Sequence, residues 1–204
     1  MAYEFDGLNI NWGGGGGFAR GDWRFVRTVI EELDVKTVLE YGCGLSTELM
    51  VAMGLDVLSL ETQKQFADIY GVAGFNVKLC DYDEGYPPHI TYTRDFDLCF
   101  VDGPGEQERH DRSKSVLHAM EHCQAIYLHD YNLGQFKHLD LSNDWLSVTA
   151  YTERQNHLYV RIPSPSTPLS SLPGGVWQLG NVLSGRGVKL SDKFAELALK
   201  RAAR

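Results

Sequence analysis

The chain has 204 residues, of which 43% are hydrophobic and 23% charged, and a formal net charge of −8. This composition is typical of a globular protein, and the length suits about one domain with an appendage. No apolar run approaches the length of about 18 residues that a membrane span needs. The acidic balance argues against nucleic acid as a partner, because phosphate contacts usually need a basic face.

The four cysteines lie far apart and form no CxxC pair. This spacing favours reduced thiols in the core over a zinc site. The N-terminal sequence lacks the basic start and apolar middle of a signal peptide. We therefore expect a cytoplasmic protein that does not associate with a membrane.

Helical and strand-like patterns alternate from residue 22 to residue 128. Apolar residues recur at helical spacing in residues 22–33, 46–53, 63–70 and 112–123. Short β-favouring runs lie at residues 37–42, 57–60, 77–79, 96–101 and 125–128. Strands that alternate with helices in this way predict βαβ units and a parallel sheet.

The pattern changes beyond Asn132. Residues 146–151 and 157–162 read as two strands joined by the short polar TERQN, which predicts an antiparallel hairpin at one edge of the sheet. The predicted fold class is therefore α/β, with a doubly wound, mostly parallel, Rossmann-like sheet of seven strands.

Three segments divide the chain. Residues 1–19 are rich in glycine and are expected to be flexible, residues 20–162 form the domain, and residues 163–204 begin with a Pro/Ser linker and continue as a C-terminal extension. Ser191 can cap a final helix over residues 192–202. We expect the apolar residues of the extension to dock on the domain or on a second subunit, which makes a homo-oligomer one outcome.

The most specific local pattern is VLEYGCGLST, residues 38–47, in which a strand ends at Glu40 and a helix opens soon after. Gly42 and Gly44 allow backbone N–H groups to approach a ligand closely. The dinucleotide-binding fingerprint has a third glycine three residues later, where this chain has Thr47. Two interpretations stay open: a cofactor-binding loop, and an ordinary turn between a strand and a helix.

Two later strand ends favour the cofactor-binding loop. Glu61 ends the second strand, where α/β nucleotide sites place an acid on ribose hydroxyls. Asp81 ends the third strand and is followed by Tyr82, so that an acid could accept from an adenine amino group while a ring stacks nearby. Such positions converge on the crevice where open α/β sheets bind ligands.

These motifs resemble those of the class I S-adenosylmethionine-dependent methyltransferases. LEYGCGLST is similar to their first motif, acid-x-Gly-x-Gly-x-x, and the acids at 61 and 81 fall where their second and third motifs occur. The resemblance covers residues 20–162 and departs at Ser46, where a third glycine is common, as in the "GST" type. It implies S-adenosylmethionine as cofactor, bound by Glu40, Gly42, Cys43, Gly44, Ser46, Thr47, Glu61, Asp81, Tyr82 and Asp102.

The ends of the fourth and fifth strands carry a second group of residues. DLCFVDGPG places Asp102 after the fourth strand, and IYLHDYN places His129 and Asp130 after the fifth. This arrangement resembles the metal-dependent O-methyltransferases of the catechol type, where an Asp after the fourth strand and an Asp-Asn pair after the fifth hold Mg²⁺. Tyr131 takes the Asn place here, with Asn132 one position further. The arrangement is also similar to polysaccharide O-methyltransferases that modify glucuronic acid units.

Three roles remain open for Asp102, His129 and Asp130. They could together hold a divalent ion, Mg²⁺ or Mn²⁺, that binds the oxygens of the substrate and lowers the pKa of a hydroxyl. Without a metal, His129 could act as a general base oriented by one of the acids. The structural alternative has Asp130 capping the next turn and His129 bonding a backbone carbonyl.

Two further patterns are weaker. His118 and His122 are four residues apart, as in the zinc-binding HExxH, but the glutamate is misplaced at 121, which favours an exposed helix face. Residues 11–23, NWGGGGGFARGDW, suit a lid over the cofactor or a disordered leader.

The predicted function is methyl transfer from S-adenosylmethionine to a hydroxyl of a small molecule or sugar, assisted by a divalent metal. The alternatives are a metal-independent methyltransferase with His129 as general base, an enzyme that uses the same crevice for another nucleotide such as NAD, and a non-catalytic nucleotide-binding or assembly protein with this fold.

Overall fold

The computed structural model describes residues 18, 20–80, 95–103, 112–130, 136, 139, 145–151 and 155–161. The predicted adenine contacts Asp81 and Tyr82 lie outside the described residues. So do the extension from residue 163 and the glycine run of the N-terminal segment.

The predicted alternation of helices and strands is confirmed within the described residues. The elements follow one another in the order α1 (Arg20–Glu32), β1 (Thr37–Tyr41), α2 (Leu45–Ala52), β2 (Asp56–Glu61), α3 (Lys64–Val72), β3 (Val77–Leu79), β4 (Phe96–Val101), α4 (Ser113–His122), β5 (Cys123–Leu128), β6 (Trp145–Tyr151) and β7 (Gln155–Arg161). α4 passes directly into β5 at Cys123, which adopts an extended backbone with φ −127° and ψ 150°, so this strand starts two residues earlier than its sequence pattern predicts.

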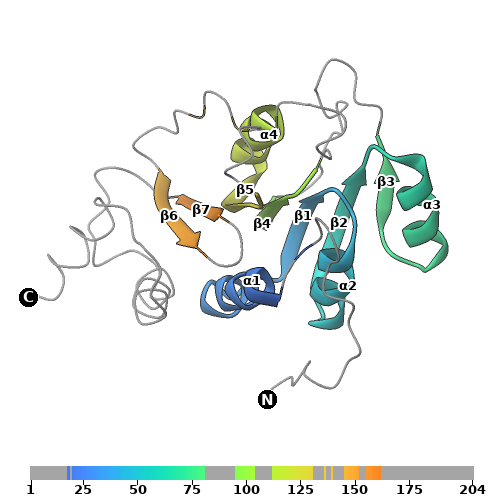
Figure 1. Ribbon diagram of the computed structural model, residues 1–204, viewed down its shortest axis with the longest axis horizontal. Coiled ribbons are helices and arrows are strands. Elements are labelled where there is room, and N and C mark those ends of the chain that lie inside the picture. Colours follow the sequence, from blue (N-terminus) through green and yellow to red (C-terminus); the bar gives the residue numbers. More distant parts are fainter. Residues whose placement is uncertain are drawn as a thin grey trace, which may run out of the picture.

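The strands form one sheet in the order β3-β2-β1-β4-β5-β7-β6 (Figure 1). Strands β1 to β5 pair in parallel, while β7 runs antiparallel to both β5 and β6. The mostly parallel α/β sheet with an antiparallel hairpin at one edge is thus confirmed. The chain builds outward from β1 to β3, then returns to β4 and builds the other way, so the strand order reverses between β1 and β4.

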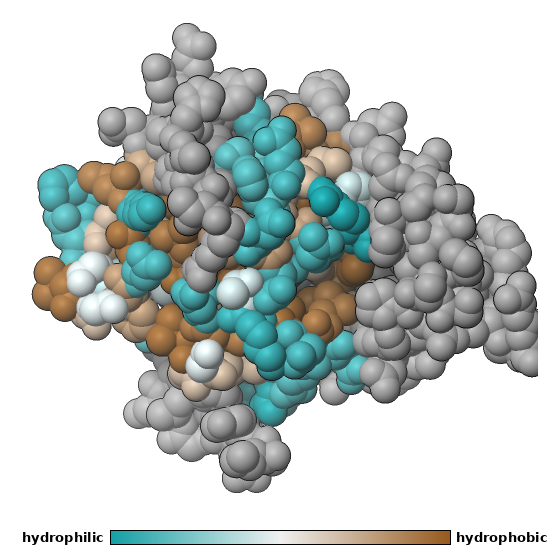
Figure 2. All heavy atoms as spheres, turned by 180° about the vertical axis from the view of Figure 1, so that it is seen from behind, coloured by the Kyte–Doolittle hydropathy of each residue, from teal (hydrophilic) through white to brown (hydrophobic). Residues whose placement is uncertain are grey.

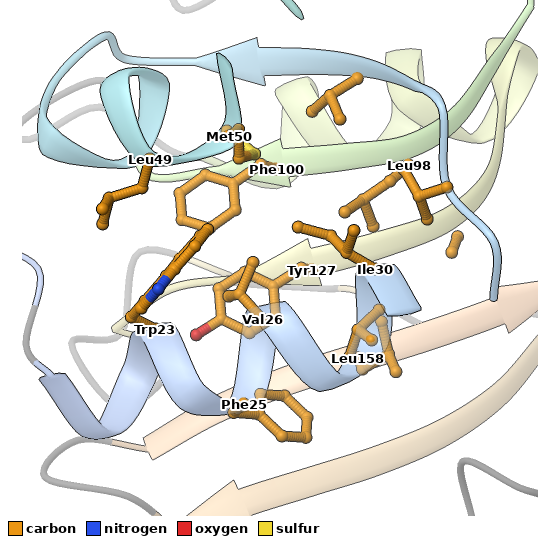
Figure 3. Packing of buried hydrophobic residues seen from close by; sticks show 14 of the residues in the cluster. Trp23, Phe25, Val26, Ile30, Leu49, Met50, Leu98, Phe100, Tyr127 and Leu158 are labelled. Carbon is orange, nitrogen blue, oxygen red and sulfur yellow. The ribbon is translucent and has the colours of Figure 1, made fainter. Parts of the chain in front are cut away.

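Helices cover both faces of the sheet, and each face has its own hydrophobic core. On one face, α1 and α2 pack on the sheet, and Figure 3 shows Trp23 and Val26 of α1 directed toward Phe100 and Tyr127 of β4 and β5. On the other face, α4 packs through Val116. The doubly wound arrangement follows from strands that are apolar on both sides.

α3 differs from the other helices because none of its residues is buried. It lies at the β3 edge of the sheet, where large apolar side chains are exposed: Phe66, Ile69, Val72 and Leu79. This edge lies at the left in Figure 2, where hydrophobic and hydrophilic surface are mixed. Among the described helices, none is long and apolar enough to cross a membrane.

Candidate functional site

The candidate site lies at the carboxyl ends of β1, β2, β4 and β5. Three backbone hydrogen bonds continue the sheet one residue beyond the strands, because the N–H of Gly42 donates to Leu60, that of Asp102 to Tyr41 and that of His129 to Val101 at 2.8–3.0 Å. These bonds fix the register of the residues that follow each strand. Open α/β sheets bind ligands at this edge, at the point where the strand order reverses.

Two glycines meet at that reversal point. Gly42, after β1, has φ +89°, and a Cβ added to Gly103, after β4, would lie 2.8 Å from the Gly42 nitrogen. Gly42 is thus required by a left-handed backbone and Gly103 by close contact. The contact separates a first half of the site, on β1 and β2, from a second half on β4 and β5. Sequence reasoning missed Gly103, since only a contact between segments 61 residues apart reveals it.

Glu40 holds the glycine loop in the first half of the site through hydrogen bonds to its side chain. Its side chain is fully buried, and its carboxylate accepts hydrogen bonds from the hydroxyls of Ser46 at 2.5 Å, Thr47 at 2.6 Å and Ser59 at 2.5 Å. The Thr47 hydroxyl in turn accepts from the N–H of Gly44 at 2.9 Å. The predicted contacts Glu40, Ser46 and Thr47 are therefore brought together, and these hydrogen bonds hold the loop in shape.

Burial raises the pKa of Glu40 to about 7, although the hydrogen bonds from Ser46, Ser59 and Thr47 act to lower it. Removal from water disfavours the charged carboxylate, and three neutral donors compensate only in part. Glu40 therefore exchanges its proton near neutral pH.

Glu61 ends β2 beside the glycine loop, as predicted. One carboxylate oxygen accepts from the N–H of Cys43 at 3.0 Å and from its thiol at 3.3 Å. The other accepts from the N–H groups of Thr62 at 2.7 Å and Gln63 at 2.8 Å. Burial, together with Glu61, holds the pKa of the Cys43 thiol well above its usual range, so this cysteine stays a neutral thiol.

Gly44 opens onto free space among the described residues. A Cβ added there would meet no described atom within 4 Å, and its φ of 178° is an extended conformation that any residue adopts. None of the described residues therefore requires glycine at this position. A ligand that approaches the backbone closely would require it.

Asp102, His129 and Asp130 converge in the second half, as predicted. Their ligand atoms all lie within 4.8 Å of one another. The His129 Nδ1 is 2.8 Å from a carboxylate oxygen of Asp102 and 3.6 Å from one of Asp130. Asp130 has φ +55°, a left-handed conformation that is uncommon outside glycine and is often found at functional sites.

A third acid, Asp22, also contacts this cluster. Asp22, in the first turn of α1, is fully buried. One of its oxygens is 3.3 Å from the His129 Nε2, and the other accepts from the side-chain amide of Asn156 on β7 at 2.6 Å. Sequence reasoning missed Asp22 and Asn156, because an acid in the first turn of a helix is ordinary and nothing local links residues 22, 129 and 156.

The charges in the second half nearly balance. Burial lowers the pKa of His129, but Asp102, Asp22 and Asp130 outweigh it and raise this pKa to about 10. The ring is therefore an imidazolium at neutral pH. Arg112, also buried, places its guanidinium 3.6 Å from Asp102. Three carboxylates thus face two cations among the described residues, which leaves one negative charge.

The ring of His129 is also held by aromatic side chains. Phe18 lies with its ring centroid 5.3 Å away, and Phe100 stacks at 6.5 Å with an interplanar angle of 22°. Phe18 and Trp23 are both buried, so these two residues of the 11–23 segment pack into the core. The glycine run between positions 13 and 17 lies outside the described residues.

His118 and His122, the histidine pair on α4, do not belong to this cluster. His118 Nδ1 is hydrogen-bonded to the hydroxyl of Tyr41 at 2.6 Å, and its ring contacts that of His122 with centroids 5.3 Å apart. Neither belongs to a group of three ligands among the described residues, where the one such group is that of Asp102, His129 and Asp130.

Known proteins offer limited comparison. No protein-family model matches the chain, and no curated protein matches it. Among solved structures, an O-methyltransferase from Bacillus cereus in complex with SAH has a TM-score of 0.48 and 14% identity, with 72% of this chain and 84% of that chain covered. An rRNA methylase from Streptococcus thermophilus has a TM-score of 0.47 and 11% identity, covering 72% of this chain and 99% of the other.

A methyltransferase-like protein from Silicibacter pomeroyi has a TM-score of 0.46 and 20% identity, with 78% of this chain and 93% of that chain covered. All three likenesses fall below a TM-score of 0.5. These likenesses are too distant to assign a function to this chain.

Proposed function

We propose that this protein transfers a methyl group from S-adenosylmethionine to a hydroxyl of a small molecule or sugar. The observation that carries the proposal is that a Cβ added to Gly44 would meet no described atom within 4 Å, in a loop that Glu40 holds in shape and that Glu61 flanks. A backbone left bare at the reversal point of an α/β sheet suits a cofactor that passes close above it.

The first half of the site supplies the groups that the cofactor needs. The loop from Gly42 to Gly44 would pass beneath its methionine part. Glu61 is placed to accept from ribose hydroxyls, because a carboxylate has about four lone-pair positions. Three of them take backbone N–H groups, and a ribose hydroxyl would replace the weak thiol donor of Cys43 at 3.3 Å. We also propose that Asp81 and Tyr82, which the resemblance assigns to adenine, bind the adenine ring.

The second half fits a divalent cation. Six-coordinate ions with bonds of about 2.1 Å separate neighbouring ligand atoms by about 3 Å, and the His129 Nδ1 lies 2.8 Å from Asp102 and 3.6 Å from Asp130. Binding would replace the proton on Nδ1 by the ion and would neutralise the residual negative charge of the cluster. Two carboxylates and one imidazole suit Mn²⁺ or a later metal better than Mg²⁺.

When bound, such an ion would hold the oxygen of the substrate and lower the pKa of its hydroxyl. The chain itself has two tasks. The first half of the site orients the methyl sulfonium, and the second half orients the acceptor, so that the two reacting atoms meet in line. Asp102 is suited to face the acceptor because its side chain is 27% exposed, against 9% for Asp130 and 1% for His129.

The metal-independent alternative is the weaker one. A general base must be unprotonated at the operating pH, whereas the surrounding carboxylates raise the pKa of His129 to about 10. An imidazolium cannot accept the proton of a hydroxyl.

A thermal-shift screen with S-adenosylhomocysteine, NAD and Mn²⁺ tests the proposal. We expect stabilisation by S-adenosylhomocysteine and by Mn²⁺, each alone, because they occupy different halves of the site. Stabilisation by NAD but not by S-adenosylhomocysteine would replace methyl transfer with another use of the same crevice.

A further inference from the structure

We infer that Asp22 is a positioning residue that, together with Asn156, holds the His129 ring so that Nδ1 faces Asp102 and Asp130, and thereby sets the affinity of this site for a divalent ion. The inference rests on the proposed function in one respect, the metal at the second half of the site. It adds a role for α1 and β7, two elements that the ligand set itself does not include.

Asp22 lies in a buried position where a carboxylate needs polar partners. Its side chain is fully buried in the first turn of α1, and a buried carboxylate is costly unless charged or polar groups pair with it. Both oxygens have polar partners, His129 Nε2 at 3.3 Å and Asn156 Nδ2 at 2.6 Å. The carboxylate is thus fixed by β7 on one side and aimed at the ring on the other.

The orientation of the His129 ring also supports a positioning role for Asp22. Its two nitrogens point in opposite directions, and each faces an acid: Nδ1 lies 2.8 Å from Asp102 and Nε2 lies 3.3 Å from Asp22. A histidine that binds a metal usually donates its other ring N–H to a carboxylate, which fixes the tautomer and makes the free nitrogen a better ligand. Asp22 stands in that position.

The neighbouring rings of Phe18 and Phe100 do not determine which of its two flipped orientations the His129 ring adopts. Phe18 and Phe100 lie against the His129 ring and restrict its tilt, but apolar contacts do not distinguish one nitrogen from the other. The charged hydrogen bond to Asp22 does, because a ring flip would turn a C–H toward the carboxylate.

The experiment measures the binding of Mn²⁺ and of S-adenosylhomocysteine by calorimetry, on the full chain. Asp130→Ala shows whether Mn²⁺ binds at the second half of the site, because this variant should abolish Mn²⁺ binding and leave S-adenosylhomocysteine binding within twofold. In Asp22→Asn, the amide oxygen can still accept from the protonated Nε2, and the NH2 group can donate to the oxygen of Asn156 after that amide flips, but the negative charge beside the ring is lost. We expect Mn²⁺ affinity to fall about 10- to 100-fold and S-adenosylhomocysteine affinity to stay within twofold.

Two further variants sharpen the test. The exchange Asp22→Asn with Asn156→Asp returns the negative charge to the same buried pair and should recover part of the lost Mn²⁺ affinity. Asp68→Asn makes the same chemical change at an exposed ion pair on α3 and should alter neither affinity. If Asp22→Asn does not fold, Asn156→Ala decides instead, and we expect it to lower Mn²⁺ affinity without loss of S-adenosylhomocysteine binding.

Three results would overturn the inference: Asp22→Asn with the Mn²⁺ affinity of the unaltered protein, an equal loss of both affinities, or an unaltered protein that binds no Mn²⁺. The proposed methyl transfer fails separately, through absence of S-adenosylhomocysteine binding in the unaltered protein.

Discussion

Gly42 and Gly103 lie so close together that Gly103 has no room for a side chain and a Cβ on Gly42 would lie 3.1 Å from the backbone of Gly103. A Cβ on Gly103 would lie 2.8 Å from the nitrogen and 2.9 Å from the Cα of Gly42, both backbone atoms that no rotamer change can move. The contact joins the loops after β1 and β4 at the point where the strand order reverses. The two halves of the site are therefore held at a fixed separation.

Replacement of Gly103 by alanine should consequently move the glycine loop. We expect Gly103→Ala to lower the free energy of unfolding by about 1–3 kcal/mol, because overpacking against backbone forces the loops apart. Urea denaturation measures the loss. A variant as stable as the unaltered protein would show that the loops separate at no cost and would remove the contact as a determinant of the site.

Gly44 should behave in the opposite way. Because a Cβ there meets no described atom within 4 Å, we expect Gly44→Ala to change the free energy of unfolding by less than about 0.5 kcal/mol. The added methyl would occupy the space proposed for the cofactor, so S-adenosylhomocysteine affinity should fall at least about tenfold, or about 1.4 kcal/mol.

Gly71→Ala is the matched control for Gly44→Ala. It adds the same methyl group in open space near the end of α3 and should leave S-adenosylhomocysteine affinity unchanged. A Gly44→Ala variant that binds S-adenosylhomocysteine as well as Gly71→Ala does would place the cofactor elsewhere.

Glu61 couples the loop to the proposed ribose contact. We expect Glu61→Ala to weaken S-adenosylhomocysteine binding by about 1.5–3 kcal/mol, because ribose hydroxyls would lose an acceptor in a buried pocket. The variant also leaves the N–H of Cys43 without the carboxylate oxygen that now lies 3.0 Å away, so its melting temperature should fall as well. Calorimetry measures the binding, and unchanged affinity would remove Glu61 from the site.

The pH dependence of stability should report the protonation of Glu40. Its pKa is about 7 in the folded protein against an ordinary 4.5, so the folded state binds the proton more tightly than the unfolded state does. The stabilisation from this proton is complete below about pH 4.5 and is lost as the pH rises to about 7. The full loss is about 3 kcal/mol, at 1.36 kcal/mol per pH unit.

Glu40→Gln removes this titration. We expect the free energy of unfolding of the variant, relative to that of the unaltered protein, to rise by up to about 3 kcal/mol between pH 4.5 and pH 7.5. Urea denaturation at several pH values measures the difference. A difference that does not change with pH would show that Glu40 titrates alike in both states.

The pattern of the sequence predicted the sheet well because its strands are apolar on both faces and its helices amphipathic. The same pattern placed Glu61 and Asp102 at strand ends, and parallel pairing then brought them to one edge. These features depend on local composition and on the general rules of α/β folds, which is why one sequence suffices to find them.

Contacts between distant segments could not be predicted. The sequence placed Asp102 and Asp130 at strand ends, but nothing in it showed that His129 Nδ1 lies 2.8 Å from Asp102 and 3.6 Å from Asp130, or that Arg112 lies 3.6 Å from Asp102. Asp22 reaches the same cluster from the first turn of α1. Such pairings depend on how α1 and α4 pack against the sheet, and no local pattern specifies that packing.

We propose that Glu61 and the loop from Gly42 to Gly44 form a site for S-adenosylmethionine. Calorimetric titration of the full chain with S-adenosylhomocysteine, and separately with NAD, tests it most directly. We expect saturable binding of one S-adenosylhomocysteine per chain and no measurable binding of NAD. Absence of S-adenosylhomocysteine binding at millimolar concentration, or equal binding of NAD, would contradict it.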